Sequence, residues 1–195
     1  MSTPGPGDGL RTIGVAIAIP EPYGGDLQRW RESFRDPLAQ AIPTHVTLLP
    51  PTEVTAADLP GIEEHLRRVA ATERPFEIHL RGTGTFRPVS PVVFVALAGG
   101  ISDCERVERR IRSGPLGRTL TFNYHPHVTV AHDVPEDNLD RAFSGLAGYE
   151  ARFNVWGFSL YEHGSDGVWR PARDYPMGSL PPGPQPGTPP GIAAG

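Results

Sequence analysis

The tetrapeptide HVTL at residues 45–48 is repeated as HVTV at residues 127–130, 82 positions further along the chain, and this repeat indicates the fold. In an extended strand, successive side chains point to opposite faces. The histidine and threonine of each copy therefore share one face, and the two apolar side chains occupy the other. Each copy offers an imidazole and a hydroxyl from a single polar face.

Two such strands side by side would bring four polar side chains into one pocket, those of His45, Thr47, His127 and Thr129. Hydrolysis at a phosphoryl group needs a base that takes a proton from the attacking water and an acid that protonates the departing oxygen. Histidine, with an ordinary pKa of about 6.5, supplies both forms around neutral pH. Threonine hydroxyls can donate hydrogen bonds to phosphoryl oxygens. The pattern predicts acid–base catalysis without a metal, and its near-symmetry leaves open which histidine is the acid.

The repeat extends beyond the two motifs. An apolar run, at residues 13–19 and again at 92–97, precedes each motif and is followed by apolar residues at helical spacing. After each motif come a second helical pattern and a strand-like segment, the last of which runs from Phe153 to Tyr161. Each half therefore reads strand, helix, motif strand, helix, strand. We predict one bilobal domain with two pseudo-twofold-related lobes, at about residues 10–82 and 92–163.

Composition suggests the limits of this domain. The chain has 195 residues, and many of its 23 glycines and 23 prolines fall near the two ends. Neither end contains material for a hydrophobic core. We therefore predict disordered tails at residues 1–9 and 181–195, with a single domain over residues 10–180.

Charge and cysteine content favour a cytoplasmic protein that does not coat long nucleic acids. The formal net charge is −4, whereas proteins with many phosphate contacts usually present a basic surface. Cys104 is the only cysteine, which excludes an internal disulfide. The sequence shows neither a membrane-spanning apolar run nor a secretory signal. We expect no membrane association, and a monomer is the favoured oligomeric state.

The paired motifs, with Pro50-Pro51 after the first and Tyr124-His125-Pro126 before the second, resemble the 2H phosphoesterase superfamily. This superfamily is also described as the 2′-5′ RNA ligase-like or RNA 2′,3′-cyclic phosphodiesterase family. The resemblance covers about residues 13–175. It implies an α+β fold, the bilobal 2H phosphoesterase-like fold, with mainly antiparallel sheets flanking a central cleft.

The same resemblance implies a function. His45 and His127 would be the catalytic pair acting on a 2′,3′-cyclic phosphate or a 2′,5′ linkage, and Thr47 and Thr129 would hold phosphoryl oxygens. No metal and no cofactor is implied. The expected partner is an RNA 3′ end or a small nucleotide that carries a cyclic phosphate.

Several further residues are candidates for substrate binding. Phe86 is the first candidate to stack on a base, since the resemblance places an aromatic residue beside the cleft there, and Tyr124, Tyr23 and Trp169 are further aromatic candidates. Arg87, Tyr124 and His125 are possible additional contacts, whereas the odd spacing of His132 from the second motif predicts that it faces away. Arginines in or near predicted loops are candidates to line a phosphate-binding cleft: Arg81, Arg87, Arg118, Arg170 and Arg173.

Three alternatives remain open on the sequence. The same groups could catalyse the reverse reaction, 2′-5′ RNA ligation. The chain could instead be a non-catalytic module that binds RNA ends or nucleotides. A metal hydrolase could use His125, His127, His132 and Asp133 as ligands, but it would leave the first motif unexplained.

Overall fold

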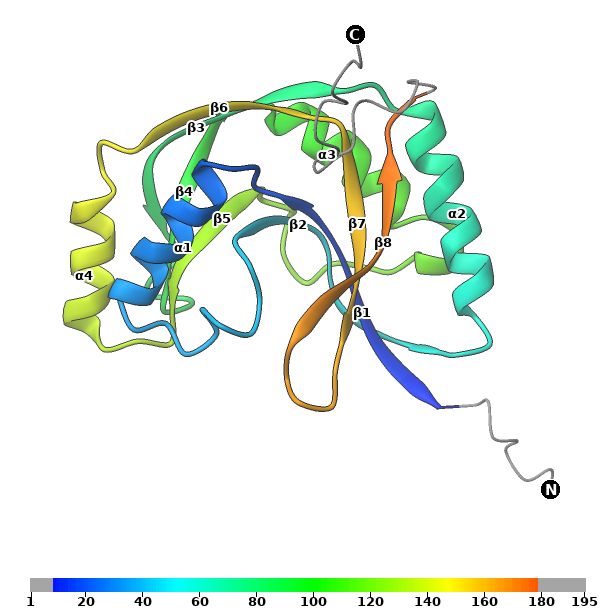
Figure 1. Ribbon diagram of the computed structural model, residues 1–195, viewed down its shortest axis with the longest axis horizontal. Coiled ribbons are helices and arrows are strands. Elements are labelled where there is room, and N and C mark those ends of the chain that lie inside the picture. Colours follow the sequence, from blue (N-terminus) through cyan, green and yellow to red (C-terminus); the bar gives the residue numbers. More distant parts are fainter. Residues whose placement is uncertain (1–8, 179–195) are drawn as a thin grey trace, which may run out of the picture.

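The computed structural model describes residues 9–178 (Figure 1). The predicted tails at residues 1–9 and 181–195 lie outside this range, except for Gly9. In chain order the elements are β1 (Leu10–Ala18), α1 (Tyr23–Ser33), β2 (His45–Thr55), α2 (Leu59–Thr72), β3 (Phe76–Thr85), β4 (Val92–Gly99), α3 (Ile101–Ile111), a 3-10 turn (Gly114–Leu116), β5 (His127–His132), α4 (Glu136–Gly145), β6 (Glu150–Val155), β7 (Gly157–His163) and β8 (Trp169–Pro176).

The strands form one curled antiparallel sheet in the order β6-β3-β4-β5-β2-β1-β7-β8. The motif strands β2 and β5 adjoin at its centre. Outward from the centre, β2, β1, β7 and β8 form one lobe, and β5, β4, β3 and β6 form the other. The predicted α+β fold with two related lobes is confirmed, and the pseudo-twofold axis passes between β2 and β5.

The two lobes exchange elements of the two sequence halves. β3, which ends the first half, pairs with β4 and β6 of the second half. In exchange, β7 pairs with β1. Residues 10–82 and 92–163 thus describe the repeat along the chain, whereas the spatial lobes combine strands from both. The apolar runs of β1 and β4 lack alternation, so their sequences carry no information about which strand lies beside them.

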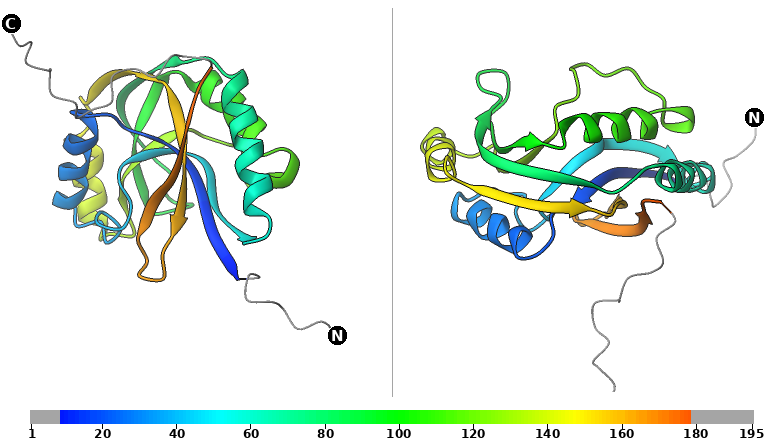
Figure 2. Two further views of the ribbon diagram at one scale, coloured as in Figure 1. Left: turned by 45° about the vertical axis from the view of Figure 1, so that its right-hand side comes forward. Right: turned by 90° about the horizontal axis from the view of Figure 1, so that it is seen from above.

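The helices lie in two pairs at opposite ends of the sheet. Helix α1 contacts β5, and α4 contacts β3, β4 and β5. Helix α2 contacts β8 and α3, while α3 contacts β2. Figures 1 and 2 show α1 beside α4 at one end and α2 beside α3 at the other. No helix within residues 9–178 is long and apolar enough to cross a membrane.

The segment predicted as one strand from Phe153 to Tyr161 is two strands, β6 and β7. They belong to different lobes, because β6 pairs with β3 and β7 pairs with β1. The chain changes lobes at Trp156, whose exposed fraction is 56%. The sequence pattern missed this crossing because both strands alternate buried and exposed residues, and one residue separates them.

The centre of the sheet is buried on β1 and β4, as their continuous apolar runs predict. The side chains of Ile13, Val15, Val93 and Val95 are at most 1% exposed. Burial of each such side chain stabilises the fold by about 1.5–3 kcal/mol. This core holds β2 and β5 from both sides and fixes the strands that carry the two motifs.

Candidate active site

The register between β2 and β5 determines how the two motifs face each other. Val46 pairs with Val128 across the antiparallel ladder. His45 therefore lies opposite Thr129, and Thr47 lies opposite His127. Side chains opposite each other in such a pair have Cβ atoms about 4.5–5.5 Å apart. The structure thus brings the four predicted side chains together on one face of the sheet, each histidine beside the threonine of the other motif.

A backbone hydrogen bond fixes the tautomer of each histidine. Nδ1 of His45 lies 2.7 Å from the carbonyl oxygen of Pro43, and Nδ1 of His127 lies 2.7 Å from that of His125. A carbonyl only accepts, so both Nδ1 atoms carry the proton and donate it. In the neutral rings, Nε2 is left with its lone pair. The Nε2 atom of His45 lies 3.2 Å from Oγ1 of Thr47, on the polar face.

Both motif strands contain a β-bulge one residue past the threonine. On β2, Thr47 pairs with Ala16 but Leu49 pairs with Val15, so Leu48 is the extra residue. On β5, Thr129 pairs with Phe94 but Ala131 pairs with Val93, so Val130 is extra. The extra residue and its successor are both buried in each strand. A bulge shifts the alternation of side chains by one position.

The bulge on β5 places His132 on the same face as His127 and Thr129. His132 lines the same cavity as His45, and its Nε2 lies 3.3 Å from Oδ2 of Asp133. The expectation that His132 faces away was wrong, because it assumed an unbroken alternation. Two adjacent buried apolar residues follow the threonine in both copies of the motif, and this was the available signal for a bulge.

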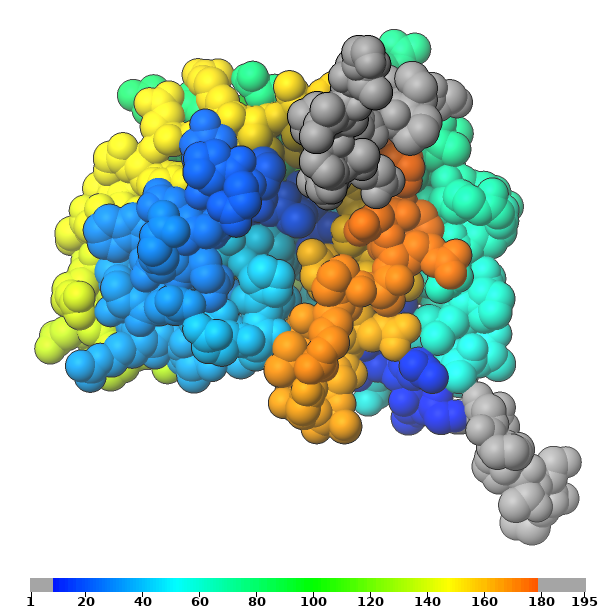
Figure 3. All heavy atoms as spheres, viewed as in Figure 1, coloured from blue at the N-terminus to red at the C-terminus, as the bar shows by residue number. Residues whose placement is uncertain are grey.

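A cavity of about 300 Å³ opens beside His45. It extends from the motif strands across β1 to β7 and β8, and the α1–β2 connection closes one side. Its lining combines motif residues with small, apolar and aromatic side chains: Gly14, Val15, Ala16, Arg31, Leu38, Ile42, His45, Thr47, Leu49, Pro51, Thr129, His132, Tyr161 and Trp169. Figure 3 shows the β7–β8 hairpin, in orange, beside the blue-to-cyan connection on this face.

Arg31 contributes a buried positive charge to this cavity. Its side chain is 3% exposed, and its Nε donates to Oδ2 of Asp36 at 2.8 Å. One Nη atom donates to the carbonyl oxygen of Ile42 at 3.0 Å. These bonds hold the guanidinium in place. The charge of Arg31 is one of those that lower the pKa of His45.

The environment lowers the pKa of both motif histidines. Burial, assisted by the charge of Arg31, lowers the pKa of His45 to about 4, although the hydrogen bond to Pro43 opposes the shift. Burial also lowers the pKa of His127, with His125 contributing and the hydrogen bond to the His125 carbonyl opposing. Arg31 acts on His45 alone of the two. The two halves of the site therefore differ in which charged groups act on the histidine, although their motifs match.

Aromatic side chains surround His127. The ring of Phe94 lies 5.1 Å from that of His127, and Phe86 meets the same imidazole edge-on at 4.9 Å. Phe86 also packs against Phe94 at 4.6 Å. His125 is exposed and lies 5.7 Å from Phe86. Phe86 and His125 are thus beside the site, as predicted, while their roles stay predictions.

The other candidates lie at the margin of the site. Tyr124 donates its hydroxyl to the backbone carbonyl of Thr47 at 2.8 Å, and burial raises its pKa. Arg87 binds Glu136 and Asp140 of α4. None of the five arginines singled out from the sequence is among the residues that line the cavity. The cavity's arginine comes instead from the buried face of α1, which sequence spacing marks only as part of an apolar stripe.

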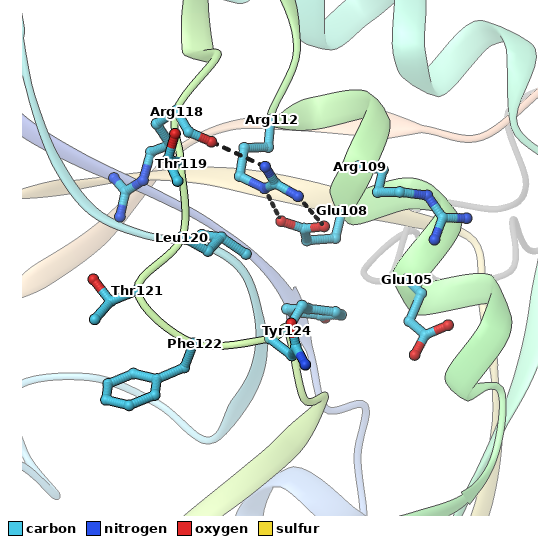
Figure 4. Close-up of a pocket in the computed structure, with 11 residues that line it drawn as sticks. Glu105, Glu108, Arg109, Arg112, Arg118, Thr119, Leu120, Thr121, Phe122 and Tyr124 are labelled. Atoms are coloured by element: carbon cyan, nitrogen blue, oxygen red, sulfur yellow. Dashed lines mark hydrogen bonds and ion pairs between the residues drawn. The ribbon is translucent and has the colours of Figure 1, made fainter.

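A second cavity, of about 530 Å³, lies against α3 and the segment that leads to the second motif. Figure 4 shows Glu108 at its centre, paired with Arg112 through an Nε–Oε1 distance of 2.5 Å. Arg112 also donates to the backbone oxygen of Arg118, and Tyr124 closes one side. No motif residue lines this cavity.

The family model of the 2′-5′ RNA ligase superfamily matches residues 19–167, which include both motifs and the strands that carry them. The chain belongs to this superfamily. A Bacillus licheniformis protein named "Putative phosphoesterase" is 30% identical over 158 residues, which cover 78% of this chain and 93% of that relative. A protein of the same name from Oceanobacillus iheyensis is 28% identical over 150 residues, covering 77% and 83%.

Solved structures of low sequence identity share the fold. Escherichia coli LigT complexed with 3′-AMP matches with a TM-score of 0.62 and 18% identity, over 87% of this chain and 99% of LigT. A crystal structure described as a phosphoesterase matches with a TM-score of 0.64 and 19% identity, over 88% of this chain and all of that one. At these identities the likeness concerns the fold.

The side chains of the described residues do not favour the metal-hydrolase alternative. Within residues 9–178, no group of three or more His, Cys, Asp or Glu residues is arranged to hold a metal ion. His132, which the metal-hydrolase alternative would use, pairs with Asp133 at the edge of the cavity. Both motif histidines instead direct Nδ1 to backbone carbonyls two residues earlier.

Proposed function

We propose that this protein is a metal-independent phosphodiesterase that hydrolyses the 2′,3′-cyclic phosphate of a small nucleotide or an RNA end. Membership of the 2′-5′ RNA ligase superfamily supports phosphoesterase activity in general terms. The observation that carries the finer proposal is the Val46–Val128 register, which sets two histidines and two threonines around one point. The names of the relatives and the nucleotide bound to LigT agree with it.

The proposed reaction is an attack of water on phosphorus. The new P–O bond forms as one P–O bond to the ribose breaks, and a phosphomonoester remains. One histidine takes the proton of the attacking water at Nε2, and the other gives a proton from Nε2 to the departing ribose oxygen. The hydroxyls of Thr47 and Thr129 donate hydrogen bonds to the non-bridging oxygens, where negative charge collects.

We base a proposed assignment of the two roles on the charge of Arg31. Arg31 lines the cavity beside His45 and disfavours a second positive charge there. We therefore assign His45 as the base, which needs to be neutral. Arg31 does not act on His127, whose pKa is lowered by burial and by His125, and we assign His127 as the acid. A bound phosphate anion would favour protonation of the acid, since opposite charges attract across a short distance.

Turnover of a 2′,3′-cyclic nucleotide in the presence of EDTA tests the proposal. The wild type is expected to hydrolyse it, and His45→Ala or His127→Ala is expected to lower kcat by about a hundredfold or more. Circular dichroism of each variant controls for folding. Activity that disappears with EDTA, or that survives in both variants, would refute the proposal.

Product analysis separates the remaining alternatives. Ligation uses the same groups in reverse, and it is detected by joining of a 2′,3′-cyclic phosphate end to a 5′-hydroxyl end. Binding of the nucleotide without turnover would indicate the non-catalytic module. A 2′- or a 3′-phosphate product would identify which bond breaks.

A further inference from the structure

We propose that the cavity beside His45 is the nucleoside subsite, and that the substrate's base packs against Trp169 instead of Phe86. This inference rests on the proposed function, because the base is placed relative to a phosphate held by the motifs. It identifies the substrate class as a phosphodiester that carries a nucleobase.

The cavity exists on one side of the site because its floor is built from small residues. On β1, Ala16 pairs with Thr47, and on β4, Phe94 occupies the corresponding position opposite Thr129. Phe94 fills the space beside His127, and Phe86 packs on it at 4.6 Å. Ala16 leaves the equivalent space beside His45 open. The two halves of the sheet therefore offer a filled side and an empty side.

Gly14 extends this open floor and seats the indole of Trp169. A Cβ atom at Gly14 would lie 3.3 Å from Cζ3 of Trp169 and 3.3 Å from the carbonyl oxygen of Leu49. Glycine inside a strand is unfavourable by about 0.5–1 kcal/mol relative to alanine, and it often marks a place where another group approaches closely. Here that group is the indole ring, which lies against the backbone of β1.

The indole is held in position from two further directions. The backbone N–H of Trp169 donates to the carbonyl oxygen of Ala41 at 2.8 Å, which ties β8 to the α1–β2 connection. The ring of His163 lies 4.9 Å from that of Trp169. Tyr161, 6% exposed, lines the cavity beside it. An aromatic wall fixed in advance loses little conformational freedom when a planar ligand binds.

The polarity of the cavity sets the direction of the ligand. Its charged and hydrogen-bonding groups, Arg31, His45 and Thr47, lie where it meets the motif strands. Its aromatic groups lie on β7 and β8, the outer strands of the lobe. A phosphate would bind at the polar end, beside the motif strands, and a base would bind at the aromatic end, on β7 and β8. A volume of about 300 Å³ is at the lower end for ligand sites and suits one nucleoside.

Two substrates that differ only in the base test this inference. Adenosine 2′,3′-cyclic phosphate carries a base, and 1-O-methylribose 2′,3′-cyclic phosphate does not. Trp169→Ala is expected to raise KM for the adenosine substrate by about tenfold and to leave KM for the abasic substrate unchanged, because base–aromatic stacking is lost only in the first. Trp169→Phe is expected to restore most of the affinity.

Trp156→Ala is the matched control, because Trp156 is exposed and does not line the cavity. Phe86→Ala tests the rival position on the His127 side. The inference is overturned if Trp169→Ala affects both substrates equally or neither, or if the base-dependent change in KM belongs to Phe86→Ala.

Failure of the proposed function gives a different result. If the wild type turns over neither substrate, dissociation constants for 2′-AMP and 3′-AMP replace KM, with 1-O-methylribose 2-phosphate as the ligand that lacks a base. A base-dependent loss of affinity of about tenfold in Trp169→Ala would then support the subsite without catalysis. Absence of binding of both nucleotides to the wild type would overturn the subsite as well.

Discussion

The two halves of the site share their motif and differ in almost everything that surrounds it. Both place a histidine opposite the threonine of the other half, tether Nδ1 to a carbonyl two residues earlier, and contain a bulge after the threonine. Around His45 the structure adds a cavity and a buried arginine, whereas around His127 it adds packed phenylalanines. The two motifs are alike, but the site that they form is asymmetric.

The asymmetry continues into the helices. Arg31 follows Trp30 on the apolar stripe of α1, and Glu108 follows Val107 at the equivalent place on α3. Both charged side chains are buried, 3% and 2% exposed. Hydrolysis needs one neutral and one protonated histidine, and two identical surroundings would give both the same preference. We propose that the charge of Arg31, which acts on His45 and not on His127, gives the two histidines different roles.

A large effect is expected from the motif threonines, which the two halves share. Thr47→Val and Thr129→Val each remove a hydroxyl while keeping a β-branched side chain of similar size. Each is expected to lower kcat by about tenfold to a hundredfold, because one hydrogen bond to the charged phosphoryl group is lost. Steady-state kinetics measures this, with Thr52→Val on the same strand as the control. Wild-type rates in both motif variants would remove the threonines from the reaction.

The pH dependence of kcat/KM can distinguish the effect of the Arg31 charge from that of the Glu108 charge. With His45 neutral above a pKa of about 4 and His127 protonated only below its lowered pKa, kcat/KM should be bell-shaped with its maximum on the acidic side of neutrality. Removal of the Arg31 charge should raise the pKa of His45 and move the acidic limb upward.

The variant Arg31→Met with Asp36→Asn makes this change without leaving a buried carboxylate unpaired. Glu108→Gln changes the charge at the equivalent place in the other half and should leave the acidic limb where it is. Equal shifts of that limb in the two variants would show that the local charge of Arg31 does not determine the pKa of His45.

A smaller effect is expected in stability. The folded state holds the pKa of His45 at about 4, below its ordinary value of 6.5, so the unfolded chain takes up a proton first as the pH falls. Stability is therefore lost between pH 6.5 and 4, by about 2 kcal/mol at pH 5. His45→Gln should be less sensitive to acid than the wild type in urea unfolding at pH 7 and pH 5. An unchanged loss, compared with His163→Gln at an exposed position, would contradict this.

The sequence predicted the parts of the fold that repeat. The motif strands, the helical stripes and the buried runs of β1 and β4 followed from periodicity, because those patterns are local. The exchange of β3 and β7 between lobes was not predicted, since pairing of distant strands leaves no local pattern. β8 was missed because most of its residues are exposed, so its sequence does not alternate between buried apolar and exposed polar positions.

The site residues also divide into those that the repeat predicted and those whose positions depend on the three-dimensional structure. The convergence of His45, Thr47, His127 and Thr129 followed from the repeat, whereas the position of His132 depended on a bulge. Arg31 was not singled out from the sequence. Its burial depends on the ion pair with Asp36, which is visible only in the three-dimensional structure. Arg87 was expected at the cleft, and its partners on α4 lie 49 and 53 residues further along the chain.

The assignment of base and acid is the central claim, and the leaving group tests it most directly. A nucleoside 4-nitrophenyl phosphodiester releases a phenolate that needs no proton, unlike the ribose oxygen of a cyclic phosphate. His45→Ala should lower kcat/KM on both substrates by about a hundredfold or more, whereas His127→Ala should do so only on the cyclic phosphate. The reverse pattern, with His45→Ala active on the nitrophenyl ester and His127→Ala inactive on both, would contradict the account.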